Sequence, residues 1–388
     1  MRKQIGTFVG AFLLTTSMAQ AIEVYSDEVN SFDLAGGLSI YYISGENDYS
    51  EVNDGFSRFN FNFNRNLGDG WNAFSHLEWG IQVSSTGHHY EVGNDGLSST
   101  GPTSDTMWLH KGYVGVNHKT YGQFTIGKQW GVSYDVGGAT DWFEVFGGDA
   151  QGTYNFDTDG GFTGTGRAEQ AIQYRISFDK LTLSAQFMAT DEVLDFKIDN
   201  NNGIAPPVFK GTLNIDESHG VSVKYEAPFD INFGIAYNKA KLKIGDENGN
   251  ELSVDDELTG AFLTYRNFGE PGLYVGLALT NMKNHDFDDQ KQVMEEANGI
   301  ELISIYRFNN PFAVVGGFIS LDDVTKATIT SRTNGKFKNE YFILSARYFW
   351  DENFYIYLEQ KIDNSVSSDP GVLPVPGNAT ALGMRFDF

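Results

Sequence analysis

The feature that most constrains this chain is a stretch in which apolar and polar side chains alternate strictly. From residue 58 to residue 64 the sequence reads Arg-Phe-Asn-Phe-Asn-Phe-Asn. Successive side chains of a β-strand point to opposite faces, so the phenylalanines share one face and the asparagines share the other with Arg58. A strand with one apolar face and one richly polar face suits a wall between lipid and water. We expect Arg58 on the water side, because a charge facing lipid at mid-depth costs about 2–4 kcal/mol.

The same unit recurs along the whole chain: an alternating stretch, a short turn, another stretch and a longer polar loop. An even number of antiparallel strands with short turns at one rim and long loops at the other is typical of a transmembrane barrel. Closure also removes the sheet edges that lipid cannot satisfy. We therefore predict an all-β fold, a sixteen-stranded antiparallel transmembrane β-barrel. The predicted strands lie near residues 32–43, 57–66, 71–83, 107–118, 122–132, 167–177, 181–190, 219–227, 230–243, 257–267, 273–283, 298–308, 312–321, 338–349, 354–363 and 380–388.

The first residues of the chain have the pattern of a secretory signal. Arg2 and Lys3 precede a short apolar stretch, and Ala19-Gln20-Ala21 is a small-residue cleavage site. We predict a signal peptide at 1–21 and a single barrel domain at 22–388. The last strand places Phe386 and Phe388 on one face, as expected if it closes the barrel against the first strand.

Composition excludes several classes of protein. The chain has 51 acidic and 27 basic residues, a net charge of −24, and the predicted mature chain has 25 basic residues and a net charge of −26. Such acidity argues against nucleic acid as a partner, because phosphate contacts need a basic face. Apolar runs are too short for a helical membrane protein, which needs about 20 consecutive apolar residues per span. A soluble β-sandwich rich in aromatic residues is the competing fold.

Catalytic and metal-binding patterns are weak. His88-His89 lies in a loop without the cysteines or the helical motif of a zinc site. The acidic stretch 246–251 departs from the spacing of a calcium loop. The sequence contains no nucleophile elbow, P-loop or dinucleotide motif. We therefore expect no enzymatic activity, no cofactor and no specific metal.

The longest predicted loop, 133–166, has an unusual composition for a surface connection. It contains Asp-Trp-Phe-Glu-Val-Phe-Gly-Gly-Asp at 141–149. Long loops in compact folds are usually functional. A loop folded inward would narrow the lumen of a sixteen-stranded barrel, which is otherwise a wide aqueous channel.

Several motifs around this loop resemble one known family, the trimeric general-diffusion porins of Gram-negative outer membranes. The resemblance is best over 107–177, and outside that range it is one of pattern. It is carried by Gly127-Lys128-Gln129-Trp130-Gly131-Val132-Ser133-Tyr134-Asp135, Thr140-Asp141, Phe146-Gly147-Gly148-Asp149, Gly166-Arg167 and Gln173-Tyr174-Arg175. The resemblance implies a homotrimer in the outer membrane, in contact with lipid and lipopolysaccharide, that passes ions and small hydrophilic solutes.

The resemblance also implies a constriction in which acidic loop residues face a basic wall. Asp141 matches the acidic side; Glu144 is displaced by one residue from the family position, which leaves its direction open. On the basic side Arg58 and Arg167 match wall arginines. His110 stands at a third basic position, with Lys111 beside it, and a neutral histidine would weaken the positive wall unless Lys111 takes its place.

Two further residues near the loop are assigned by the same resemblance. Tyr134 matches a tyrosine near the constriction. Lys128 shares its face with Phe124 and Ile126, so it is expected to point outward. There it would take a counter-charge from the loop 84–106 of a neighbouring subunit and act as a trimer latch.

The leading functional hypothesis is an outer-membrane channel for passive diffusion that prefers cations, because charged rings set ion preference. An alternative is a channel selective for sugars, with Trp142 and Phe143 as candidate stacking residues. A surface adhesin or glycan-binding β protein is the hypothesis from another class.

Overall fold

The structure of the protein is a computed structural model. It describes residues 21–388 except 47–49, 85–88, 94–95, 101–105, 199–208, 247–250, 267–268, 270, 330 and 370–376. The predicted signal peptide lies, apart from residue 21, outside the described residues and stays a prediction. Among the described residues, no helix is long and apolar enough to cross a membrane.

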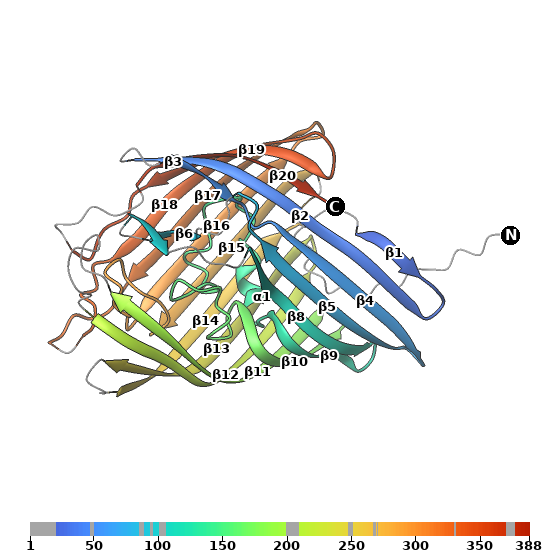
Figure 1. Ribbon diagram of the computed structural model, residues 1–388, viewed down its shortest axis with the longest axis horizontal. Coiled ribbons are helices and arrows are strands. Elements are labelled where there is room, and N and C mark those ends of the chain that lie inside the picture. The colour runs from blue at the N-terminus through green and yellow to red at the C-terminus, as the bar shows by residue number, and fades with distance from the viewer. Residues whose placement is uncertain are drawn as a thin grey trace.

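Sixteen antiparallel strands within the described residues form a closed barrel, as predicted (Figure 1). They are β2 (Asn30–Gly45), β4 (Arg58–Gly68), β5 (Trp71–Ile81), β8 (Met107–His118), β9 (Gly122–Trp130), β10 (Arg167–Phe178), β11 (Leu181–Ile198), β12 (Phe209–Ala227), β13 (Ile231–Asp246), β14 (Glu251–Tyr265), β15 (Gly272–Lys283), β16 (Ala297–Arg307), β17 (Phe312–Asp323), β18 (Lys338–Phe349), β19 (Phe354–Asp363) and β20 (Ala379–Asp387). Each strand pairs with the next, and β20 pairs with β2 from Asp387–Gly37 to Ala379–Gly45. The predicted closure through the last strand is therefore confirmed.

Four shorter strands were not predicted. β1 (Ile22–Ser26) pairs with the beginning of β2, and β3 (Ser50–Asp54) pairs with its end. β6 (His89–Gly93) and β7 (Gly96–Thr100) form a hairpin within the loop between β5 and β8. These segments lack the long apolar alternation on which the strand prediction depended.

The strands predicted at 181–190, 219–227, 230–243 and 257–267 were too short at the ends that face the long loops. The ladder between β11 and β12 continues to Ile198–Phe209, and the ladder between β13 and β14 continues to Gly245–Glu251. Backbone hydrogen bonds can continue beyond the apolar band, whereas apolar alternation is required only where a strand faces lipid. In β13, for example, the outward side chains change from Ile235 to Lys241 toward this end.

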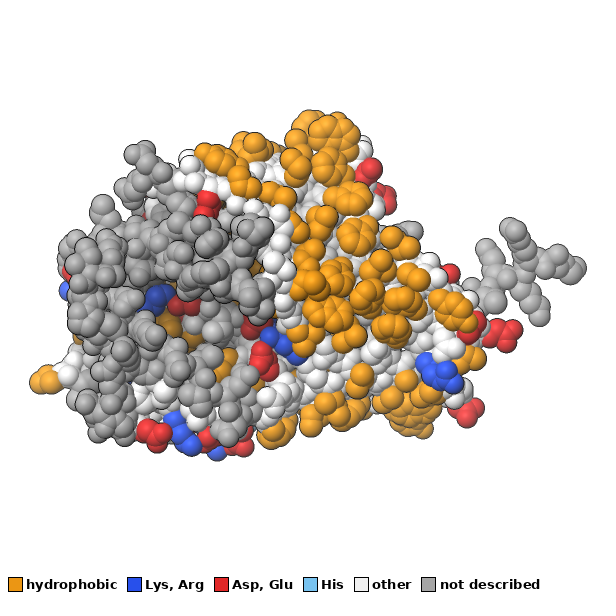
Figure 2. Space-filling view, viewed as in Figure 1, with side chains coloured by type: hydrophobic (Ala, Val, Ile, Leu, Met, Phe, Trp, Pro, Cys, Tyr) orange, Lys and Arg blue, Asp and Glu red, His pale blue; other side chains and the backbone are white. Residues whose placement is uncertain are grey.

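Alternation along the strands separates two faces of the wall. In β18, Phe342 and Leu344 are exposed on the outside, whereas Tyr341 and Ile343 are buried on the inside. Exposed hydrophobic side chains cover a broad part of the outer wall toward the short-turn end, with charged side chains near its margin (Figure 2). The buried core lies inside the barrel, where loop residues such as Ala150 pack against the wall.

Candidate functional site: a constriction inside the barrel

The segment between β9 and β10 folds into the barrel, as predicted for 133–166. It begins with the single turn α1 (Tyr134–Gly137), which contacts β13 and β14. Inward side chains of the wall then hold its backbone. Tyr274 donates its hydroxyl to the Ala139 carbonyl at 2.7 Å, and Thr280 donates to the Ala150 carbonyl at 2.7 Å.

Two buried glutamates of the wall fix the middle of the loop. Glu301 of β16 accepts hydrogen bonds from the Thr140 hydroxyl at 2.8 Å and from the Ala150 amide at 2.9 Å. Glu359 of β19 accepts from the amides of Val145 and Phe146, both at 2.9 Å. The loop therefore follows the inner wall from β13 to β19, opposite β4, β5 and β8.

The two acidic residues predicted on the loop have different environments. The Asp141 carboxylate accepts hydrogen bonds from the hydroxyls of Tyr134 at 2.6 Å and Tyr154 at 3.4 Å. Glu144 instead pairs with a cation: its Oε1 lies 3.1 Å from Nη1 of Arg347 and from the Tyr355 hydroxyl. Only Asp141 of the pair thus lacks a basic partner within 4 Å in the described part of the chain.

The predicted basic side gathers on the inner wall around a glutamate that sequence reasoning missed. Glu78 of β5 lies 4.0 Å from Nε of Arg58 and 3.3 Å from Nζ of Lys111, and His110 bonds to its other oxygen. The ladder between β5 and β8 is interrupted beside Glu78, with Lys111 opposite Glu78 and Leu109 opposite the next residue. Such a bulge turns two consecutive side chains toward one group, which explains why His110 and Lys111 both reach Glu78.

Glu78 could have been found from the strand pattern. It is directly opposite Asn60, which shares a face with Arg58, so alternation alone places it inward. Two residues earlier on the same face, Nδ1 of His76 donates to the side-chain oxygen of Asn62 at 2.7 Å. No motif draws attention to these two residues, because a single acid among 51 carries little signal.

Arg167 connects the wall with the loop through aromatic rings. Its guanidinium lies 4.9 Å from the ring centroid of Trp130 and 5.7 Å from that of Tyr154. The Trp130 ring stacks on Tyr134 with centroids 3.7 Å apart. The predicted residues Arg167, Tyr134 and Asp141 therefore belong to one continuous set of contacts. Nη1 of Arg167 also lies 3.6 Å from the Asp159 carboxylate.

Lys128 takes its counter-charges from its own chain. Its Nζ lies 2.6 Å from Glu169 on β10 and 3.2 Å from Asp159 on the inward loop. Burial disfavours the charged carboxylate of Asp159, but Lys128 and Arg167 outweigh this effect and lower the pKa of Asp159. A role for Lys128 as a trimer latch stays a prediction, and the counter-charge it was expected to draw from loop 84–106 of a neighbour is already supplied within the chain.

A second ion pair missed by sequence reasoning lies where the barrel closes. Arg385 of β20 donates Nε to Asp387 at 2.9 Å, beside Gly37 of β2. A Cβ at Gly37 would lie 2.3 Å from an Asp387 oxygen, so a side chain at this position would displace that carboxylate. Among the described residues, no three His, Asp or Glu side chains are grouped in a way that could hold a metal ion.

A closed barrel of sixteen strands, apolar outside and narrowed by a hydrogen-bonded inward loop, defines a class of protein: a channel across an outer membrane. The chain belongs to the Gram-negative porin family, whose model matches residues 7–365. It is an outer-membrane porin for passive diffusion. Its relatives in this family are channels rather than enzymes.

Individual relatives are distant but match over more than nine-tenths of the chain. The outer membrane protein S2 of Salmonella typhi and the outer membrane porin N of Escherichia coli are each 22% identical, over 100% of both chains. The solved structure of Salmonella typhi OmpF in complex with daunomycin matches with a TM-score of 0.66 at 15% identity, covering 95% of this chain and 100% of that one. OmpT of Vibrio cholerae, described in its trimer form, matches with a TM-score of 0.62 at 16% identity, covering 93% and 100%.

Proposed function

We propose that this porin is a general-diffusion channel that prefers cations, with its constriction between the loop 133–166 and the wall formed by β4, β5, β8 and β10. The observation that carries the proposal is a difference in charge compensation. Arg58 and Lys111 share Glu78, and Arg167 is paired with Asp159. Among the described residues, the hydrogen bonds to the Asp141 carboxylate come from neutral hydroxyls. Asp141 is therefore the acidic residue of the constriction whose charge is not offset by an ion pair among the described residues, and fixed charges lining a pore determine which ions enter.

A reversal-potential measurement tests this proposal. The purified protein is inserted into a planar bilayer that separates concentrated from dilute potassium chloride. We expect the sign that corresponds to faster passage of potassium than of chloride. The opposite sign would refute the cation preference without affecting the channel function.

General diffusion is favoured over a sugar-selective channel by the position of the two candidate stacking residues. The ring of Phe143 packs directly against Gly317 of the wall. A Cβ added at Gly317 would lie 2.2 Å from the Phe143 ring. Trp142 meets Tyr274 edge-on, with centroids 6.5 Å apart. Both rings thus support the loop. Liposome swelling with sugars of graded size should show rates that decline steadily with size, and a saturable outlier would favour the alternative. The adhesin hypothesis gains no support from family membership.

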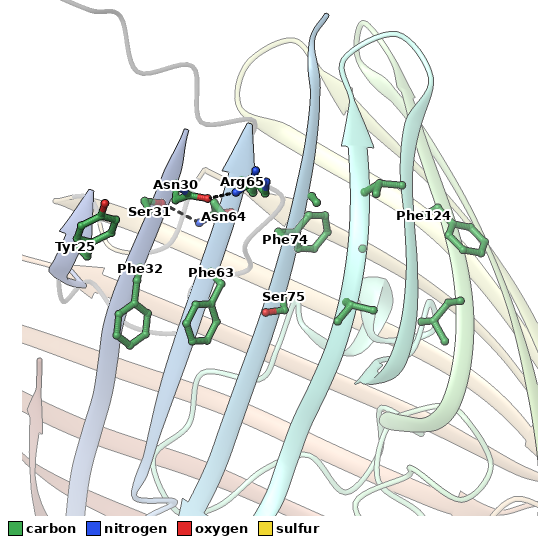
Figure 3. A pocket seen from close by; sticks show the side chains of 15 residues that line it. Tyr25, Asn30, Ser31, Phe32, Phe63, Asn64, Arg65, Phe74, Ser75 and Phe124 are labelled. Carbon is green, nitrogen blue, oxygen red and sulfur yellow. Dashed lines mark hydrogen bonds between the residues drawn. The ribbon is translucent and has the colours of Figure 1, made fainter. Parts of the chain in front are cut away.

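We also propose that the channel is a homotrimer whose subunits pack through the outer face of β2, β4, β5, β8 and β9. A relative of similar fold is described as a trimer. This face carries a groove of about 780 Å³ (Figure 3). The rings of Phe32 and Phe63 stack on one side of the groove, with centroids 4.6 Å apart, and Phe124 and Ile126 line the other side. Between them lies Ser75, whose side chain is small. Side chains of a second copy would fill this groove.

A filled groove tests the proposed interface. Ser75→Trp should lower the temperature at which the trimer dissociates on a non-reducing gel, because the indole would occupy the space intended for the neighbour. Ser304→Trp on β16, which is also on the outward side but far from the groove, should leave that temperature unchanged. Equal behaviour of the two variants, or a wild-type chain that migrates as a monomer, would contradict the proposal.

Contact with outer-membrane lipid and lipopolysaccharide belongs to the same proposal. The exposed apolar residues of the wall would face acyl chains. Beyond them, the outward Lys239, Lys241 and Lys243 of β13 alternate with acidic partners near the long-loop end. Binding of lipopolysaccharide, measured by its retention after detergent washing, should decrease when the three lysines are replaced by glutamine.

A further inference from the structure

A buried histidine outside the constriction holds the inward loop. His285 follows β15 and is 1% exposed. Its Nε2 lies 2.9 Å from the carbonyl oxygen of Gly152 on the loop, and its Nδ1 lies 2.7 Å from Oδ2 of Asp256 on β14. The amide of Asn155 lies against the ring, 3.4 Å from both ring nitrogens. The ring of His285 thus joins the inward loop to β14 through a group that titrates.

The chemistry of the two partners determines where the protons lie. A carbonyl oxygen can only accept, so Nε2 must carry a proton for the bond to Gly152 to exist. One more proton, shared between Nδ1 and Asp256, makes the buried pair neutral overall, whether it is imidazolium with carboxylate or imidazole with carboxylic acid. If that proton is lost, the imidazole has one N–H left. It can then donate to Gly152 or to Asp256, but not to both.

Asp256 would compete strongly for that last proton. Its other oxygen, Oδ1, is buried and has no hydrogen-bond partner. A buried carboxylate without a donor is far more costly than a buried carbonyl without one. In the deprotonated pair the imidazole N–H would therefore turn to Asp256, and the bond to the loop would be lost.

The bond to Gly152 lies close to the residues of the constriction. A Cβ at Gly152 would lie 2.5 Å from Leu258, so the loop touches the wall here. Two residues later, Tyr154 bonds to Asp141 at 3.4 Å and faces the Arg167 guanidinium at 5.7 Å. On the other side of Tyr154, the Phe156 amide donates to Asp286 at 3.0 Å. The position of Tyr154 thus depends on the attachment of Gly152 and Phe156 to the segment that follows β15.

We propose that His285 is a positioning residue of the constriction: the proton that it shares with Asp256 maintains its bond to Gly152, and loss of this proton at alkaline pH releases this part of the loop. The proposal rests on the channel function but not on the sign of the ion preference. Conductance tests it, whereas the reversal potential tests the preference.

The charged groups around His285 either raise its pKa or are paired with a group of opposite charge. Burial disfavours the imidazolium, but the carboxylates of Asp256 and Asp286 and the Gly152 carbonyl outweigh it, so the pKa of His285 is raised. From β14, Glu257 is paired with Lys239 and Lys283. From the loop, Asp157 is paired with Lys291. A raised histidine pKa moves the loss of this bond to a higher pH than an ordinary histidine would give.

Single-channel recording over a range of pH is the test. For the wild type we expect a steady conductance at neutral pH and, above an alkaline transition, increased open-channel noise with additional conductance levels. In Asp256→Asn the amide donates to Nδ1, so the neutral imidazole keeps its proton on Nε2. The alkaline transition should therefore disappear, with neutral-pH behaviour at every pH.

Two further variants separate positioning from a merely structural role. In the Asp256→Asn background, His285→Leu removes the bond to Gly152 without leaving a buried carboxylate, and noisy behaviour is expected at every pH. Asp286→Asn, beside the histidine, should keep the alkaline transition. Barrel integrity is checked by heat-modifiable gel mobility. A wild-type profile that stays flat at alkaline pH, or a transition that persists in Asp256→Asn, would overturn the proposal.

Discussion

At the scale of single residues, charge compensation distinguishes side chains that look alike in the sequence. Asp141 and Glu144 are both acidic loop residues. One contacts two tyrosine hydroxyls and the other pairs with Arg347. Alternation predicts which face of a strand a residue occupies, but not which partner comes across the lumen from another part of the chain.

Asp141→Asn should reduce the cation preference, because it removes a carboxylate that has no cation within 4 Å among the described residues. The tyrosine bonds to the side-chain carbonyl oxygen can remain, so the loop should keep its path. The reversal potential measures the change. Unchanged selectivity would mean that Asp141 does not face the ions.

Glu78→Gln should also shift selectivity toward anions, for a different reason. It leaves Arg58 and Lys111 without their shared carboxylate. Breaking a buried ion pair in this way typically costs about 3–5 kcal/mol, so the variant should also unfold at a lower temperature. Selectivity and thermal unfolding are measured on the same preparation. A shift in stability without a shift in selectivity would place Glu78 away from the ion path.

Asp286 should make stability depend on pH. Burial raises its pKa to about 6, above the ordinary value of 3.8, so the folded chain binds more protons than the unfolded chain between these values. Stability should therefore fall as pH rises through that window, by up to about 3 kcal/mol. Thermal unfolding at about pH 4 and about pH 7 measures this effect. Asp286→Asn should remove most of it, and an unchanged difference in the variant would assign it to other groups.

At the scale of elements, small residues in the wall decide how closely the inward loop can approach. Gly276 of β15 and Gly299 of β16 face loop carbonyls. An added Cβ would lie 2.0 Å from the Ala139 oxygen and 1.9 Å from the Ala150 oxygen, respectively. Both distances are shorter than any contact between unbonded atoms. The hydrogen bonds from Tyr274 and Thr280 to the same two carbonyls depend on this approach.

Gly299→Ala should therefore displace the loop and change the single-channel conductance. Gly316→Ala in the next strand is a matched control, because a Cβ there would meet nothing within 4 Å. Equal conductance of both variants and the wild type would show that the loop can shift without affecting the pore.

At the scale of the whole molecule, the net charge of the chain and the closure of the barrel together determine the electric field at the pore entrance. A chain of net charge −24 surrounds an aqueous channel, so its field extends into the pore entrance. Salt screens this field over about 10 Å at 0.1 M and about 3 Å at 1 M.

The cation preference should consequently weaken as salt concentration rises. Reversal potentials measured at a constant gradient, from dilute to concentrated potassium chloride, follow this change. A preference independent of salt would assign selectivity to close contacts within the constriction and not to the charge of the whole barrel.

The sequence by itself determined the wall of this protein, because alternation is a local property with a period of two. The strands predicted at 107–118, 338–349 and 354–363 have the observed bounds, and the inward loop was recognised from its length and from family resemblance. Only the tertiary structure decided the partners inside the barrel. Three contacts join residues that are far apart in the chain: Glu78 with Lys111, Arg347 with Glu144, and His285 with Gly152. Such contacts arise when the barrel closes and brings distant strands to one lumen, and no local pattern encodes them.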